Sequence, residues 1–253
     1  MKVDAVILAG ADNAGPLREC AQEPYEALIS INGRPMVEYV VEAVRQAHSV
    51  GRIAVVGPRA ELEQALHGRV DLVVERGRSL VENILLGIEA LAPQGKVLLV
   101  TSDLPLLTPE AIDDFVAQCA RRRADVYYAI VARESNEAKY PGVRRTYVRL
   151  KEGVFTGGNL VLLEPWVILQ HRRLIEQAVA ARKEPWQLGR LLGVRVIVKF
   201  VLNRLSIAEV EKRVQKKLGF VGAGVISRYP EVGIDVDKPS DLELARRVCG
   251  TPV

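Results

Sequence analysis

The first residues whose types and spacing suggest chemistry form a loop behind a short apolar run. Residues 3–8 are too few for an ordinary helix and read as a buried strand. The loop that follows contains Gly10 and Gly15 and ends at Arg18. Such a junction delivers backbone N–H groups and one cation to a phosphate, so it predicts a nucleotide site. Similar junctions also occur in many folds that bind no nucleotide.

Two later segments carry carboxylates that could bind a metal ion. Asp103 follows the apolar run 96–101, and Asp235 and Asp237 stand just ahead of a helix that starts near Ser240. Oxygen ligands of this kind suit Mg²⁺. Both segments also fit a structural role, because an aspartate at a strand end or before a helix commonly serves as a turn or cap residue.

The elements that must position these residues alternate along the chain. We expect strands at residues 3–8, 52–56, 70–74, 96–101, 126–132, 146–150 and 159–163. We expect helices at residues 35–47, 59–67, 79–91, 108–123, 166–182, 206–218 and 240–248. A polar loop is expected at 134–143, while the pattern at 194–201 fits either a helix or a strand. Ser79 and Glu82 have the spacing of a reciprocal capping box, and Trp166 and Trp186 are assigned to packing.

Strands that are apolar throughout favour a mostly parallel sheet covered by helices on both faces. Ligands of such sheets bind where the strands end, which directs attention to residues 9–18, 57, 75–79 and 102–103. With 253 residues, 49% of them hydrophobic, the chain can bury a large core. We expect one domain over residues 1–253, with a nucleotide-binding half at 1–120 and an acceptor-side half at 121–253.

The charge and the cysteine content argue against several classes of partner and site. The net charge is +4, but most basic residues stand beside Glu or Asp and no aromatic-rich basic motif is present, which argues against a nucleic-acid partner. Cys20, Cys119 and Cys249 are too far apart for a CxxC metal site or a disulfide framework. The start of the chain resembles no leader, and no apolar run reaches membrane-spanning length. We therefore expect a cytoplasmic protein without a membrane partner.

Taken together, the segments resemble nucleotidyltransferases of the sugar-nucleotide and molybdenum-cofactor guanylyltransferase type, which share an NTP transferase domain. The resemblance rests on four segments in the family's order: Leu8–Arg18, Asn32–Met36, Asp103–Leu106 and Asp237–Leu242. It implies an α/β fold with a three-layer, mixed, mostly parallel Rossmann-like sheet. It also implies that a phosphate oxygen of an acceptor attacks the α-phosphorus of a nucleoside triphosphate and releases pyrophosphate, with Mg²⁺ as cofactor.

The resemblance implies roles for particular residues. The catalytic residues would be Arg18, Asp103 and Asp237, and the two aspartates would hold the metal. The nucleotide would contact Leu8, Ala9, Gly10, Ala11, Gly15, Ser79 and Asn83. The acceptor would contact Lys139, Gly157, Gly158 and Asn159. The partners would be a nucleoside triphosphate and a small phosphorylated acceptor, and a homodimer is compatible with this scheme.

Several of these residues have structural alternatives. Ser79 and Asn83 could be a helix cap and an ordinary polar helix residue, and residues 156–159 could be a tight strand entry instead of an acceptor-side turn. The basic residues Lys139, Arg144, Arg145 and Arg149 could receive a phosphorylated acceptor or form a solvated face.

The sequence departs from the family pattern in the opening region. Ala11 replaces the second glycine, the path to Arg18 is longer than usual, and Glu26 stands where the family has a lysine. A carboxylate beside a triphosphate is repulsive. Either another base such as Arg34 or Lys139 substitutes, or the protein binds nucleotides without catalysis, as a regulatory protein would. Glycosyl transfer is a further alternative, but the Asp-x-Asp spacing is absent at the end of the central strand, where Leu104 follows Asp103, and Asp235–Asp237, which has the spacing, comes too late in the chain.

Overall fold

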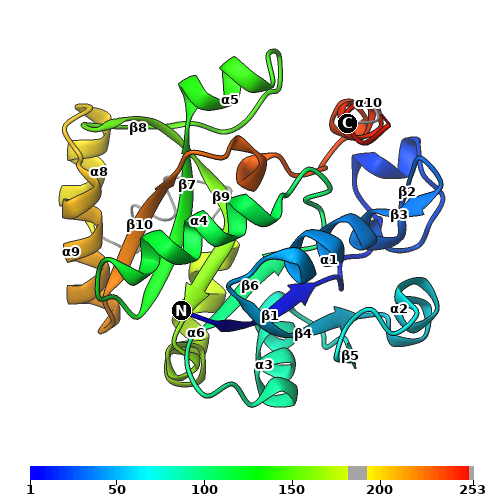
Figure 1. The fold of residues 1–253 in the computed structure, drawn as a ribbon. Coiled ribbons are helices and arrows are strands. Elements are labelled where there is room, and N and C mark those ends of the chain that lie inside the picture. The colour runs from blue at the N-terminus through cyan, green and yellow to red at the C-terminus, as the bar shows by residue number, and fades with distance from the viewer. Residues whose placement is uncertain (182–192, 251–253) are drawn as a thin grey trace.

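The computed structural model describes residues 1–181 and 193–250, so Arg182 at the expected helix end and Trp186 lie outside it. Its centre is an eight-stranded sheet (Figure 1). The strand order is β10 (Gly222–Ser227), β7 (Val126–Ala132), β9 (Gly153–Leu163), β6 (Val97–Thr101), β1 (Val3–Leu8), β4 (Val50–Gly57) and β5 (Leu72–Glu75), and β8 (Val148–Leu150) pairs with β9.

The sheet is mixed and mostly parallel, as predicted. β1 pairs in parallel with β4 and β6, β4 with β5, and β10 with β7. β9 is antiparallel to β6, β7 and β8. Parallel strands end at the same edge, so the loops after β1, β4, β5 and β6 all emerge together.

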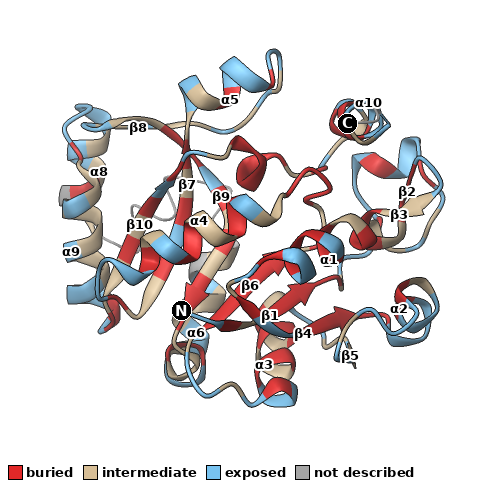
Figure 2. Ribbon diagram, viewed as in Figure 1, coloured by how far each residue is buried: buried red, intermediate tan, exposed pale blue. Residues whose placement is uncertain are grey.

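Helices cover both faces of the sheet, which gives three layers. Ala5 and Ile7 of β1 pack with residues of α1 (Met36–Gln46), α2 (Arg59–Leu66) and α4 (Pro109–Ala120). Val6 and Leu8, on the opposite face of the same strand, pack with α3 (Leu80–Leu91) and α6 (Pro165–Ala181). This alternation explains why β1 is apolar at nearly every position. Figure 2 shows the resulting burial of the central strands.

The remaining elements flank the sheet. They are α5 (Arg133–Lys139), α8 (Val194–Val201), α9 (Ile207–Leu218), α10 (Pro239–Cys249), the short 3₁₀ turns η1 (Pro16–Glu19), η2 (Glu26–Leu28) and η3 (Pro230–Gly233), and the hairpin β2 (Ser30–Ile31) and β3 (Arg34–Pro35). Asn32 and Gly33 both have positive φ and form the hairpin turn. No helix among the described residues is both long enough and apolar enough to cross a membrane.

Four local predictions were wrong or incomplete. Residues 133–139 form helix α5 instead of a polar loop, and residues 156–159 lie inside β9 instead of a turn or a strand entry. Strand β10 was not predicted, because Gly222 and Gly224 interrupt its pattern. Both glycines allow α9 to lie close: a Cβ at Gly222 would approach Val214 to 3.1 Å, and one at Gly224 would approach Ile207 to 3.3 Å.

The fourth prediction, a reciprocal capping box of Ser79 and Glu82 at the start of α3, was only half right. The Ser79 hydroxyl accepts a hydrogen bond from the backbone N–H of Glu82 (3.2 Å), so Ser79 caps the helix as expected. The Glu82 carboxylate, however, accepts from the backbone N–H of Arg78 (2.8 Å) and does not complete a capping box with Ser79.

Candidate active site

The loop after β1 and the segment after β6 meet at the carboxyl edge of the sheet. Leu8 and Thr101 are register partners, and the backbone N–H of Ser102 donates to the Leu8 carbonyl (3.1 Å). The N–H of Ala9 donates to the Val56 carbonyl of β4 (2.8 Å). Asp103 therefore emerges beside the loop that begins at Ala9.

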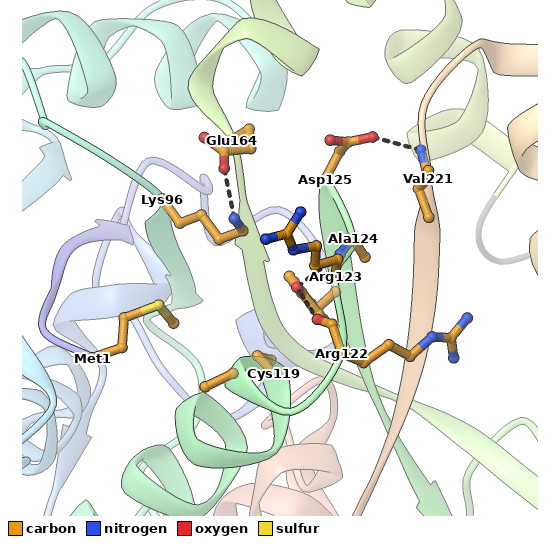
Figure 3. Close-up of a pocket in the computed structure, with 11 residues that line it drawn as sticks. Met1, Lys96, Cys119, Arg122, Arg123, Ala124, Asp125, Glu164 and Val221 are labelled. Atoms are coloured by element: carbon orange, nitrogen blue, oxygen red, sulfur yellow. Dashed lines mark hydrogen bonds and ion pairs between the residues drawn. The ribbon is translucent and has the colours of Figure 1, made fainter.

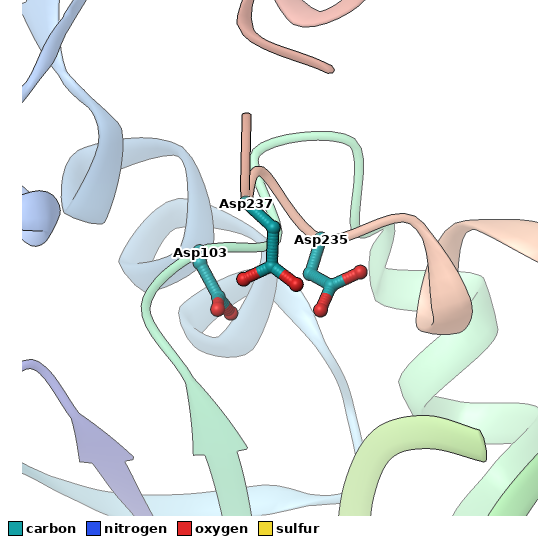
Figure 4. Close-up of side chains that lie close together, drawn as sticks. All are labelled: Asp103, Asp235 and Asp237. Carbon is teal, nitrogen blue, oxygen red and sulfur yellow. The ribbon is translucent and has the colours of Figure 1, made fainter. Parts of the chain in front are cut away.

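Three carboxylates gather at this edge (Figure 4). One carboxylate oxygen from each of Asp103, Asp235 and Asp237 lies within 4.8 Å of the other two. A backbone hydrogen bond from Val236 N–H to the Asp103 carbonyl (2.9 Å) joins the two segments that carry them. The resemblance implied a metal set of Asp103 and Asp237, and the structure adds Asp235, which the sequence had marked as a possible oxygen ligand.

Burial and neighbouring charges raise the pKa of Asp103 and of Asp235. Burial, followed by repulsion from Asp235 and Asp237, raises the pKa of Asp103 to about 7, although a hydrogen bond from the Thr101 hydroxyl opposes the shift. Burial also raises the pKa of Asp235, while the Arg145 guanidinium opposes it. A site that gathers negative charge in this way and offers carboxylate oxygens fits a hard divalent cation.

Arg145 fixes the turn that carries Asp235 and Asp237. Its guanidinium donates to the carbonyls of Gly233 (3.1 Å) and Asp235 (2.6 Å) and forms an ion pair with Asp241 (3.3 Å). The side chain is only 8% exposed. Arg145 is therefore turned inward instead of forming part of a basic face, and no sequence signal marked this role, which depends on contacts about 90 residues away.

The loop after β1 folds back on itself. Asp12 and Tyr25 form an isolated antiparallel bridge, and the buried Asn13 side chain donates to the Ala21 (3.1 Å) and Glu23 (2.9 Å) carbonyls. The exposed Arg18 donates to the Gln22 carbonyl (2.9 Å) of the same loop. Its contact with phosphates stays a prediction, as do the nucleotide contacts of residues 8–11 and Gly15.

Arg76, which the sequence reasoning did not single out, reaches this loop from the end of β5. Its Nη1 donates to the Gly10 carbonyl (2.9 Å) and to the Asp12 carboxylate (2.8 Å). Buried Asn83 accepts from the Gly77 N–H (2.7 Å), and a Cβ at Gly10 would lie 2.6 Å from its Nδ2. Asn83 thus supports the loop directly. The sequence signal that could have identified Arg76 is its position in residues 75–79, which follow a predicted parallel strand.

The residues assigned to the acceptor side have partners within the protein. Lys139 forms an ion pair with Glu231, which is almost fully buried and also accepts from the Tyr140 hydroxyl (3.3 Å). A Cβ at Gly157 would lie 2.2 Å from the Tyr128 hydroxyl, and one at Gly158 would lie 3.0 Å from the Ala129 Cβ. These glycines thus leave room for side chains of β7, the neighbouring strand in the sheet. Acceptor contacts by them, by Lys139 and by Asn159 of the same strand stay predictions.

The bases proposed as substitutes for the missing lysine are both paired. Arg34 contacts Glu38 (3.3 Å) and Glu42 (2.7 Å), and Lys139 contacts Glu231. Neither is therefore a free cation beside the loop that contains Glu26.

A separate surface hollow lies at the amino ends of β6 and β7 (Figure 3). Within it Lys96 pairs with Glu164 (2.5 Å), and the Asp125 carboxylate accepts from the Val221 N–H (2.7 Å). Burial raises the pKa of the Cys119 thiol to about 12, so it is not an activated nucleophile. These polar groups have structural roles, and the carboxyl edge is the stronger candidate site.

Comparisons with known proteins agree with this fold. The family model "MobA-like NTP transferase domain" matches residues 5–198. A structure from Thermus thermophilus described as a hypothetical transferase is 40% identical, with a TM-score of 0.82, and the match covers 96% of this chain and 100% of that one.

Two curated relatives carry more specific names. A 3-deoxy-manno-octulosonate cytidylyltransferase of Rhodopseudomonas palustris is 27% identical over 90% of this chain and 92% of its own length. The bifunctional protein GlmU of Thermoanaerobacter pseudethanolicus is 34% identical over 33% of this chain, and the match covers only 19% of GlmU. The family model spans well over half of the sequence. The chain therefore belongs to the MobA-like NTP transferase family, as its resemblance to nucleotidyltransferases predicted.

Proposed function

We propose that this protein is a Mg²⁺-dependent nucleotidyltransferase that joins a nucleoside monophosphate to a small phosphorylated acceptor. The observation that carries the proposal is the cluster of Asp103, Asp235 and Asp237 beside the loop after β1. Family membership supports a nucleoside triphosphate as the substrate. The acceptor and the metal dependence belong to the proposal alone.

The carboxylate cluster fits Mg²⁺ in chemistry and in charge. All three side chains offer oxygen ligands, and Arg145 is the cation that contacts the cluster among the described residues, through Asp235. Asp237 is exposed, so a ligand can reach it, and the pKa of Asp103 is raised first by burial and then by the neighbouring carboxylates. When bound, the metal would neutralise phosphate charge near the reacting phosphorus.

The reaction is a displacement at the α-phosphorus. An acceptor phosphate oxygen forms a bond to that phosphorus, the bond to the bridging oxygen of the β-phosphate breaks, and pyrophosphate leaves. The attacking oxygen is already deprotonated, so the protein needs no dedicated base. The chain's contribution is to position both substrates: the loop from Ala9 to Gly15 holds the nucleotide, and the edge near β9 faces the acceptor.

Pyrophosphate release tests the proposal. The wild-type chain should release pyrophosphate from a nucleoside triphosphate in the presence of Mg²⁺ and a suitable acceptor. Asp103→Ala should abolish release while its melting temperature stays close to that of the wild type. Glu89→Ala, at an exposed position on α3, is the matched control and should keep full activity. Undiminished turnover by Asp103→Ala would refute the proposed mechanism.

A non-catalytic nucleotide-binding role is the second candidate. It is favoured by Glu26 at the position of the family's lysine and by Arg18, whose guanidinium is hydrogen-bonded to its own loop. Tight binding of a nucleoside triphosphate by calorimetry, with no pyrophosphate release across a broad acceptor panel, would select this role over catalysis.

A further inference from the structure

The Arg76 guanidinium is held in one place by three neighbours of the loop after β1. Nη1 donates to the Gly10 carbonyl (2.9 Å) and to Asp12 (2.8 Å), and the guanidinium carbon lies 4.8 Å from the centre of the Tyr25 ring. The backbone N–H of Arg76 donates to the Gly57 carbonyl (3.0 Å) at the end of β4. Both ends of the side chain are therefore fixed.

These contacts use one of the three guanidinium nitrogens. Within residues 1–181 and 193–250, neither Nε nor Nη2 of Arg76 has a hydrogen-bond acceptor. The N–H groups on Nε and Nη2 lie along one edge of the planar guanidinium, and together they match a ligand with two adjacent acceptors. The side chain is 28% exposed, so a ligand can reach it.

The strand order separates Arg76 from the carboxylates. β6, which leads to Asp103, is on one side of β1, whereas β4 and then β5, which leads to Arg76, are on the other. Neighbouring strands lie about 4.8 Å apart, so the ends of β5 and β6 are separated by roughly 14 Å. The placement of the nucleotide rests on the proposed function, in which the α-phosphate lies at the carboxylates. A nucleotide that extends from there across Gly10 presents its base to Arg76.

We infer that Arg76 reads the nucleobase and selects guanine or cytosine. Guanine presents O6 and N7, and cytosine presents O2 and N3, as pairs of adjacent acceptors for the two free N–H groups. Adenine places an amino group beside N7 or N1, and uracil places an N–H between its two carbonyls. Either base would set a donor against a donor of Arg76, and a site built for hydrogen bonds rejects such a mismatch.

Calorimetric titration of the full chain with ATP, GTP, CTP and UTP in Mg²⁺ tests the inference. GTP or CTP should bind at least about tenfold more tightly than ATP and UTP, and comparison of these two identifies the base. Arg76→Lys keeps the charge but loses the planar edge, so it should reduce that preference to less than about threefold. Arg121→Lys, at an exposed position directly after α4, is the matched control and should keep the full preference.

The outcomes separate this inference from the proposed function. A wild-type preference for ATP or UTP, or an unchanged preference in Arg76→Lys, overturns the role of Arg76 and leaves nucleotidyl transfer standing. Failure of all four nucleotides to bind contradicts the proposed function and removes the basis of the inference with it. Melting temperatures of both variants without nucleotide should match the wild type, which shows that changes in preference do not come from unfolding.

Discussion

At the scale of single residues, Glu26 is the departure from the family pattern with the most direct consequence. Its backbone N–H donates to the Ala11 carbonyl (3.1 Å), and its carboxylate lies 4.0 Å from the position that a Cβ of Gly15 would occupy. Glu26 is therefore part of the loop that we expect to meet a triphosphate. A negative charge there opposes binding.

Glu26→Lys should strengthen nucleotide binding. Replacing a repulsive charge with an attractive one at a partly exposed position is worth about 1 kcal/mol, which is roughly a fivefold lower Kd for the preferred nucleoside triphosphate. Calorimetry measures the Kd, and Glu26→Gln, which only removes the charge, should give an intermediate value. Equal or weaker binding by Glu26→Lys would show that the carboxylate does not face the phosphates.

The cysteines should differ sharply in reactivity. Cys20 is exposed, whereas Cys119 is buried in the core and burial raises its pKa to about 12. Because the thiolate is the reactive form, Cys119 should stay unmodified by a maleimide at pH 7 until the protein unfolds. Peptide mass spectrometry after brief labelling should find Cys20 modified. Rapid labelling of Cys119 in the native protein would contradict its placement on α4.

At the scale of elements, α3 approaches the sheet through Gly87. A Cβ at this position would lie 2.5 Å from Val6 and 3.0 Å from Val56, both in buried strands. Gly87→Ala should lower the free energy of unfolding by about 1–3 kcal/mol through overpacking. Denaturant unfolding measures the loss. Gly95→Ala is the control, because a Cβ there meets nothing within 4 Å, and equal stabilities for the two variants would contradict the packing of α3.

Asp113 ties α4 to the segment between α1 and β4. Burial alone would raise its pKa, but hydrogen bonds from the Ser49 hydroxyl and from the N–H groups of Ser49 and His48 outweigh burial and lower it. A carboxylate with a lowered pKa stabilises the fold above its unfolded pKa of about 3.9, and this contribution is lost as the pH falls through the folded value.

Asp113→Asn should therefore destabilise the protein by about 1–2 kcal/mol at pH 7, since the amide cannot accept as many hydrogen bonds as the carboxylate. The difference from the wild type should shrink below about pH 4, where the carboxylate also becomes protonated. Denaturant unfolding at several pH values tests this. A difference that does not change with pH would show that the charge of Asp113 contributes nothing.

At the scale of the whole molecule, the parallel strands β1, β4, β5 and β6 were predictable because their runs are mostly apolar. Short apolar runs such as residues 3–8 and 96–101 are typical of strands in a sheet that helices cover on both faces. The elements that were wrong or missed, α5, the middle of β9 and β10, are those in which polar residues or glycines satisfy a tertiary neighbour. Single-sequence periodicity does not contain that information.

The candidate site likewise contains residues that the sequence predicts and residues that only the structure identifies. Asp103 and Asp237 could be named because each stands at a recognisable strand or helix boundary, and the structure brings them together. Asp235 could also be named, beside Asp237, as a possible oxygen ligand. Arg76 and Arg145 joined the site through contacts between distant segments: Arg76 through Gly10, and Arg145 through the turn at residues 233–241. Their spacing in the sequence carries no trace of these contacts.

The most direct test of the account is a crystal structure of the chain with Mn²⁺ and a non-hydrolysable analogue of the preferred nucleotide. We predict an anomalous Mn²⁺ peak within about 2.2 Å of carboxylate oxygens from Asp103, Asp235 or Asp237, with the α-phosphate beside it and the base near Arg76. A metal and nucleotide bound elsewhere, for example at the amino ends of β6 and β7, would contradict it.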